Sequence, residues 1–223
     1  LPFLCLAAAL FLERLLEMTA FQTRRTQLAV AAAMLLSVLP LVNSLRFDRY
    51  VSRPDTRNEA ASAMRALVPD GASVGLLCGA YGCPQIPWQG DFYRSRAERE
   101  VSQGNLFKAN LYRALDNRYS AKGGPRYEKT DFDPVAGVFR RLSGEPVHPD
   151  WLVLEASPLG RISSLPYGSR RLLNGYSPAF SIESADLSCR GDSYDQEDAF
   201  YLPYAGFKCV KAPGPNLYFL KRR

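Results

Sequence analysis

Histidine is almost missing from this chain, because His148 is the only one among 223 residues. A nucleophilic site with a histidine base would have to use it, and the flanking Pro146 and Pro149 indicate an exposed loop instead. The sequence also lacks the phosphate-binding patterns G-x-G-x-x-G and G-x-x-x-x-G-K-[ST], the zinc-protease pattern H-E-x-x-H and the hydrolase pattern G-x-S-x-G. The most familiar nucleotide-binding and hydrolytic motifs are therefore excluded.

The residues that are present belong to a chain that buries a core. Hydrophobic residues make up 47% of the sequence, charged residues 22% and aromatic residues 12%, which excludes global disorder. Sixteen glycines and sixteen prolines indicate many turns and argue against one long helical bundle. The net charge of +6 is spread along the chain. A nucleic-acid surface would be more concentrated, so we expect no nucleic-acid partner.

A charge-free apolar run near the start predicts a membrane span. Residues 26–45 read TQLAVAAAMLLSVLPLVNSL, twenty residues without a charge, bracketed by Arg24, Arg25 and Arg46. A helix of this length crosses about 30 Å of hydrocarbon. The alternative is a buried core helix, but the basic flanks favour a spanning helix. A second apolar run, residues 1–12, is suited to the tail of another span.

These runs predict a three-part organisation. Residues 1–25 would hold the end of a truncated transmembrane helix and a connecting loop, residues 26–45 a transmembrane helix, and residues 46–223 an extracytoplasmic α/β domain. The first residue is Leu1 rather than methionine, and we therefore expect the chain to be a piece of a longer protein.

The expected fold class is α/β, with C-terminal transmembrane helices followed by a soluble domain that ends in a hairpin. Thr56 and Glu59 fit a capping box that opens a helix. Helix and strand patterns then alternate along the soluble part. Their expected ranges are helices from 56 to 68 and 106 to 119, strands over 72–78 and 151–155, and a terminal hairpin of 207–211 with 217–220.

Four cysteines outside the apolar runs suggest an oxidising compartment. Four cysteines allow three pairings, and the close pair Cys78 and Cys83 with the late pair Cys189 and Cys209 are the preferred bridges. The alternative is four reduced, partly buried thiols. Zinc is disfavoured, because four residues separate Cys78 from Cys83 and the single histidine is distant. We expect no metal site.

An aromatic loop offers the candidate binding residues. Trp88 and Tyr93 could stack on a sugar ring, while Asp91 bonds a hydroxyl of the sugar. The alternative is that these aromatic rings belong to the core.

Several short motifs occur in a familiar order. D-T-R at Asp55-Thr56-Arg57 leads into an alanine-rich helix, V-P-D-G-A-S-V at 68–74 opens a strand, and D-W-L-V-L at 150–154 and G-P-N-L-Y at 214–218 follow. This order resembles the C-terminal portion of polytopic, polyprenyl-phosphate-sugar-dependent glycosyltransferases. That GT-C group includes protein mannosyltransferase-like and aminoarabinose-transferase-like enzymes.

The resemblance implies transfer of a sugar from a lipid-phosphate carrier to an envelope acceptor. The implied partners are membrane lipid, a polyprenyl-phosphate-linked sugar and a glycan or protein acceptor. The implied location is the bacterial inner membrane, with the soluble domain in the periplasm. The catalytic carboxylate of the family belongs to an early extracytoplasmic loop without a counterpart here. We therefore expect no catalytic residue and no cofactor in this chain, which alone would be inactive.

Two other classes of function compete with the transferase. One is a membrane-anchored, non-enzymatic envelope module that binds glycan or a partner protein. The other is an independent hydrolase, which would need a clustered acid, base and nucleophile that the sequence does not supply.

Overall fold

The computed structural model describes residues 10, 14, 25–79, 82–156, 170–186, 188 and 209–223. The chain divides into two compact units, Leu1–Arg49 and Tyr50–Arg223. The second unit begins at Tyr50, four residues beyond residue 46, where the apolar run predicts the start of the soluble domain. Each unit is described by itself.

The membrane span expected at residues 26–45 is a wrong prediction. Helix α2, Arg25–Val51, covers this stretch, and Pro40 lies inside it. The helix does not end where the apolar run ends, because it continues through Arg46, Asp48 and Arg49. Across the part of the chain that the structure describes, no helix is both long enough and apolar enough to cross a membrane. Most of residues 1–24, the other expected membrane segment, lie outside the described residues.

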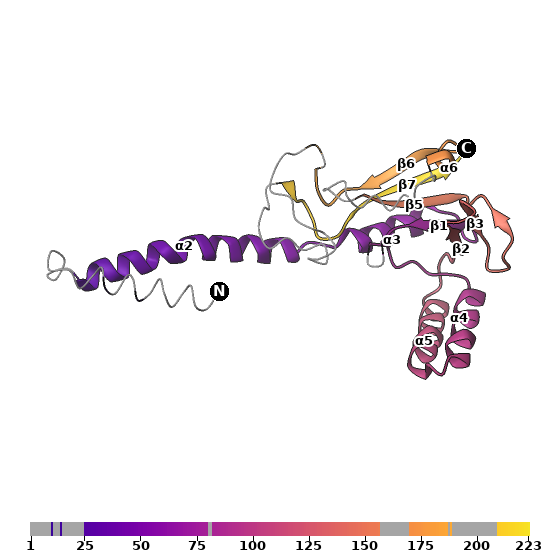
Figure 1. The fold of residues 1–223 in the computed structure, drawn as a ribbon, viewed down its shortest axis with the longest axis horizontal. Helices are drawn as coiled ribbons and strands as arrows, with labels where there is room; N and C mark the ends of the chain where they lie inside the picture. The colour runs from indigo at the N-terminus through magenta and orange to yellow at the C-terminus, as the bar shows by residue number, and fades with distance from the viewer. Residues whose placement is uncertain are drawn as a thin grey trace. The chain divides into compact units, whose positions relative to one another are not determined.

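The second unit is an α/β domain built on one mixed sheet. Its seven strands among the described residues lie in the order β4-β3-β2-β1-β5-β7-β6 (Figure 1). Strand β1 is central and parallel to both β2 and β5, whereas β7 is antiparallel to β5 and to β6. The strands are β1 Ser73–Leu77, β2 Glu128–Asp133, β3 Val138–Arg140, β4 Pro146–Val147, β5 Trp151–Ala156, β6 Tyr176–Ile182 and β7 Asn216–Arg222.

Four helices of this unit are described: α3 Thr56–Leu67, α4 Gly90–Ser102, α5 Leu106–Lys122 and the short α6 Arg170–Leu173. Helix α3 begins where the Asp55 carboxylate accepts a hydrogen bond from the Arg57 N–H at 2.8 Å. Asn105 caps α5 in the same way through the Lys108 N–H. Helix α5 ends at Gly123, which has a positive φ that glycine adopts without strain.

The two faces of the sheet carry separate apolar clusters. Side chains alternate along a strand, so Val74 of β1 and Val153 of β5 share one face with Met64 of α3. On the opposite face, Leu77 and Leu152 belong to a smaller cluster. Aromatic and leucine side chains of α4 and α5 join the first cluster, and two leucines of α6 join the second.

The terminal hairpin is the second wrong prediction of fold class. Strand β7 pairs with β5 and with β6 instead of with the segment just before it. Residues 207 and 208 of the expected partner strand lie outside the described residues, and Val210 makes a single bridge to Ala185. The chain does bend at residues 212–214, but Pro213 and Pro215 contact the start of α3, as described below.

Candidate functional site

The described helices that follow the neighbouring parallel strands β1 and β5 pack on opposite faces of the sheet. After β1 the chain enters α4 and α5, whose side chains join the first-face cluster. After β5 it reaches α6, whose Leu172 and Leu173 join the second-face cluster. Such a reversal is a topological switch point, and α/β sheets bind ligands outside the carboxyl ends of the strands at these points. The carboxyl ends of β1 and β5 are therefore the candidate site.

A buried carboxylate and a disulfide loop lie at this edge. Glu155, the second-last residue of β5, is buried and accepts a hydrogen bond from the Gly79 N–H at 2.6 Å. Gly79 directly follows Cys78, which forms a disulfide with Cys83 across a Cα separation of 5.4 Å. On the same loop, a Cβ at Gly82 would overlap the Glu155 carboxylate. Gly79 and Gly82 therefore lie directly on Glu155, and only glycine fits at position 82 without a shift of that carboxylate.

This arrangement favours a role for Glu155 in holding the loop in place over a role in acid–base chemistry. A carboxylate that accepts a backbone N–H and is covered by a loop holds that loop in place. The disulfide restrains the same loop covalently. Because Glu155 is covered, its carboxylate is not open to a ligand at this end of the sheet.

The start of α3 is hydrogen-bonded to the segment just before β7. We call these contacts, from Thr56 to Pro213 and Pro215, the clasp. Thr56 is buried, its N–H donates to the Pro213 carbonyl at 2.8 Å, and its hydroxyl donates to the Pro215 carbonyl at 2.8 Å. Gly214 lies between these prolines with φ +102°, and a Cβ there would overlap the Thr56 hydroxyl. Asp55 and Arg57 form an ion pair beside this contact. Two motifs of the noted resemblance, D-T-R and G-P-N, thus meet in space.

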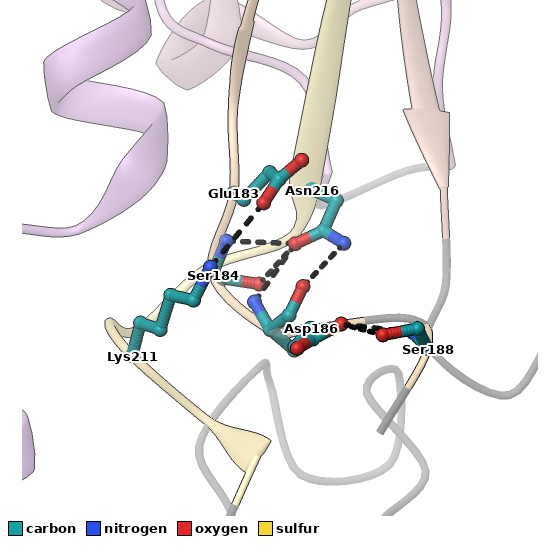
Figure 2. Close-up of polar contacts among 7 residues, drawn as sticks. Glu183, Ser184, Asp186, Ser188, Lys211 and Asn216 are labelled. Carbon is teal, nitrogen blue, oxygen red and sulfur yellow. Dashed lines mark hydrogen bonds and ion pairs between the residues drawn. The ribbon is translucent and has the colours of Figure 1, made fainter. Parts of the chain in front are cut away.

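Asn216 extends this clasp into a buried polar network, shown in Figure 2. Its side-chain oxygen accepts hydrogen bonds from the Ser184 N–H at 2.7 Å, the Ser184 hydroxyl at 3.0 Å and the Ala185 N–H at 2.9 Å. Its amide nitrogen donates to the Ala185 carbonyl at 2.9 Å. On the rim, Lys211 pairs with Glu183 at 3.3 Å. The network fixes the segment after β6 against β7, so its role is structural.

The three predicted sugar contacts do not form one open surface. Trp88 and Tyr93 are buried and belong to the first-face cluster, whereas Asp91 is exposed and pairs with Arg94 at 3.7 Å. The Tyr93 hydroxyl accepts a hydrogen bond from the Trp88 N–H at 3.2 Å, and its ring stacks on Tyr119 at 6.0 Å. Burial raises the pKa of Tyr93 to about 12, so the phenol is neutral at physiological pH.

The predicted cysteines are placed only in part. Cys78 and Cys83 are bonded to each other, as the spacing suggested. Cys209 also takes part in a disulfide, and Cys189, its predicted partner, lies outside the described residues.

No other described group assembles a catalytic site. His148 lines a groove of about 520 Å³ together with Leu172, Tyr176 and Arg222, and its described lining holds no serine, threonine or cysteine nucleophile. Within the described ranges, no group of three or more His, Cys, Asp or Glu side chains could hold a metal ion.

Glu155 and Thr56 were not predicted as site residues. A carboxylate at the end of the apolar run W-L-V-L-E was the available signal for Glu155, because such a run predicts a buried strand. For Thr56, the capping pattern gave a local role that hid its long-range one. The comparisons add no relative: no family model, no curated protein and no solved structure matches the chain.

Proposed function

We propose that the chain is a non-catalytic portion of a glycosyltransferase that takes its sugar from a lipid-phosphate carrier. In this proposal residues 50–223 form an accessory α/β domain outside the cytoplasm. The domain orders the acceptor side of the enzyme and supplies no reacting group.

One observation carries the proposal, namely the contact between Thr56 and Pro215. The resemblance to polyprenyl-phosphate-sugar-dependent enzymes was based on short motifs far apart in the sequence, and each could arise by chance. Thr56 and Pro215 are 159 positions apart, yet they share a buried hydrogen bond of 2.8 Å. The two motifs therefore lie in one structural unit, as the resemblance requires of motifs that belong to a single domain.

The disulfide-bonded cysteines support a location outside the cytoplasm. Disulfides persist in oxidising environments and are rare in the cytosol. The Cys78–Cys83 bridge lies beside the topological switch point. In the proposal this edge, restrained by the disulfide and by Glu155, is the part of the domain that contacts the acceptor or the catalytic part of the enzyme.

A non-enzymatic envelope module is the second candidate. The observation that favours it is the covered position of Glu155, together with the lack of a paired nucleophile and base among the described residues. Such a module would bind a glycan or a partner protein without any transfer.

Deletion of the gene in its source cell separates the two candidates. Isolated membranes are supplied with radiolabelled polyprenyl-phosphate sugars, and transfer to envelope acceptors is measured. If the proposal is right, deletion abolishes transfer of one sugar and its lipid-linked form accumulates. Unchanged transfer of every sugar would refute the transferase and favour the module.

Complementation then tests the role of the sheet edge. The wild-type gene should restore transfer, and so should the surface variant Ser62→Ala, which changes an exposed side chain of α3. The double variant Cys78→Ser, Cys83→Ser should restore less activity per molecule of protein, with the amount in the membrane measured by immunoblot. Full specific activity of this double variant would mean that the disulfide at this edge of the sheet does not contribute to transfer.

A further inference from the structure

The helical pair α4–α5 carries an apolar tip that its own packing does not use. The inner side of α5 is already covered by its own domain, because Ala109 is buried and Tyr112, Leu115 and Tyr119 pack against the first-face cluster. At the turn between the helices, by contrast, Phe107 is 80% exposed, Leu106 63%, Leu111 48% and Val101 41%. The two helices lie side by side, and their connecting turn points away from the sheet (Figure 1).

These apolar side chains are adjacent. Phe107 and Leu111 are four residues apart on a helix, so their side chains are neighbours on one face. Leu106 starts the same helix, and Val101 lies in the last turn of α4, five residues before the start of α5. Together they form one patch, the hairpin tip, defined as Val101, Leu106, Phe107 and Leu111. Contiguous exposed apolar side chains of this kind mark interaction sites.

The charges around the hairpin tip have a small positive excess. All four basic residues of α5 are exposed, whereas its one acidic residue, Asp116, is half-buried and paired with Arg126. On α4, Glu98 and Glu100 flank Arg99 near the tip, and Glu98 lines one pocket together with Arg113. Among the exposed residues of α5 itself there are four cations and no anion: Lys108 and Arg113 lie near the tip, and Arg118 and Lys122 lie toward the other end of the helix.

We propose that the hairpin tip inserts into the surface of a membrane that contains anionic lipids. Leucine and phenylalanine beside lysine and arginine are the composition of segments that lie about 5–10 Å deep in the headgroup boundary. Leu106 and Phe107 enter the boundary, while Lys108 and Arg113 remain at the level of the phosphates, since long basic side chains reach back to the interface.

The size of the tip favours a bilayer over a protein. A stable protein complex buries about 800 Å² on each partner. The four side chains supply less than this, because an aromatic residue buries about 150–250 Å², only Phe107 is aromatic, and Val101 and Leu111 are already more than half covered. A soft bilayer surface accepts a small convex tip and adds attraction from many lipids at once. The inference is independent of the proposed transferase, because it describes a contact with lipid and not a reaction.

The test uses the full chain with Phe107→Trp as a fluorescent reporter. The two natural tryptophans, Trp88 and Trp151, are 8% and 6% exposed, so the background signal should stay constant. Vesicles are made of phosphatidylcholine alone or mixed with phosphatidylglycerol, with bromine-labelled acyl chains as quenchers. Because the reporter detects only its own surroundings, binding through other parts of the chain does not imitate the result.

We expect a blue shift and quenching with the anionic vesicles only, and loss of both at high salt. Val135→Trp is the matched control, because Val135 is 97% exposed in the turn between β2 and β3, away from the tip, and should give no quenching. In the reporter background, Arg113→Gln should weaken binding about fivefold. Arg65→Gln, the same change on α3, should have no effect.

Three results would overturn the inference. The first is no change of the reporter with either vesicle, and the second is equal quenching of the Phe107→Trp and Val135→Trp chains. The third is a blue shift that depends on protein concentration without lipid, which would assign the hairpin tip to contacts between copies of the chain.

Discussion

The Thr56 hydroxyl donates a hydrogen bond of 2.8 Å to the carbonyl of Pro215, and this bond joins the start of α3 to the start of β7. Strand β7 in turn pairs with both β5 and β6. One hydroxyl therefore joins the first helix of the domain to the start of a strand that pairs with two others.

Thr56→Val should destabilise the domain by about 1–3 kcal/mol, because valine keeps the shape of threonine but leaves the buried Pro215 carbonyl without its donor. The free energy of unfolding is measured by urea titration. Ser62→Ala, which removes an exposed hydroxyl bonded within α3, is the control and should cost less than about 0.5 kcal/mol. Equal values for the two variants would mean that the clasp adds nothing to stability.

Gly214→Ala should cost more than Gly144→Ala. Both glycines have a positive φ, +102° and +88°, so both variants carry the strain of a left-handed backbone, about 1 kcal/mol. Only at Gly214 would the new methyl group overlap Thr56, while nothing lies within 4 Å of a Cβ at Gly144. Overlap should add about 1–3 kcal/mol. Thermal unfolding of the two variants gives the comparison, and a smaller loss at Gly214 would contradict the clasp.

The elements set by local pattern were predictable. Apolar spacing located α3 and the strands β1 and β5 to within a few residues. The predicted helix cap was Thr56, whereas the structure uses Asp55, since the Thr56 hydroxyl bonds Pro215 instead. The terminal hairpin was wrong for the same reason: the turn residues near Pro213 bond the start of α3. A local pattern does not show which distant segment a turn will contact.

Other elements were missed because their sequence signals were weak. Strand β6 contains Pro178, which usually argues against a strand, but β6 lies at the edge of the sheet and has a register irregularity there. Helix α4 mixes Phe92 and Tyr93 with many charges, so its apolar period is poor. The burial of Glu155 depends on a loop that only the tertiary fold places over it.

Asn216→Ala should destabilise the domain by about 3 kcal/mol or more. The variant removes the acceptor of three hydrogen bonds and one donor from a fully buried position. Ser188→Ala is the control, because its hydroxyl bonds Asp186 on the exposed rim of the same segment and should matter little. Urea titration measures both. A near-neutral Asn216→Ala would show that water or a shifted backbone satisfies the Ser184 and Ala185 groups.

Asp150 should give the stability of the domain a dependence on acid pH. Burial raises the pKa of its carboxyl, but the hydrogen bonds from the Ser73 hydroxyl and N–H, at 2.8 and 3.1 Å, and the charge of Arg222 outweigh burial. The net pKa is therefore lowered. A group with a lowered folded pKa stabilises the fold above its unfolded pKa, about 3.9 for aspartate, and loses this contribution as the pH falls through the folded value.

Asp150→Asn removes this titration, so its penalty relative to the wild type should be largest near neutral pH and should shrink as the solution is acidified to about pH 2. Urea titrations of both proteins across this range measure the difference. Asp91→Asn is the control, because its side chain is 83% exposed and pairs only at 3.7 Å, so its penalty should stay small throughout. A penalty for Asp150→Asn that stayed constant with pH would mean that Ser73 and Arg222 hold the neutral side chain as well as the carboxylate.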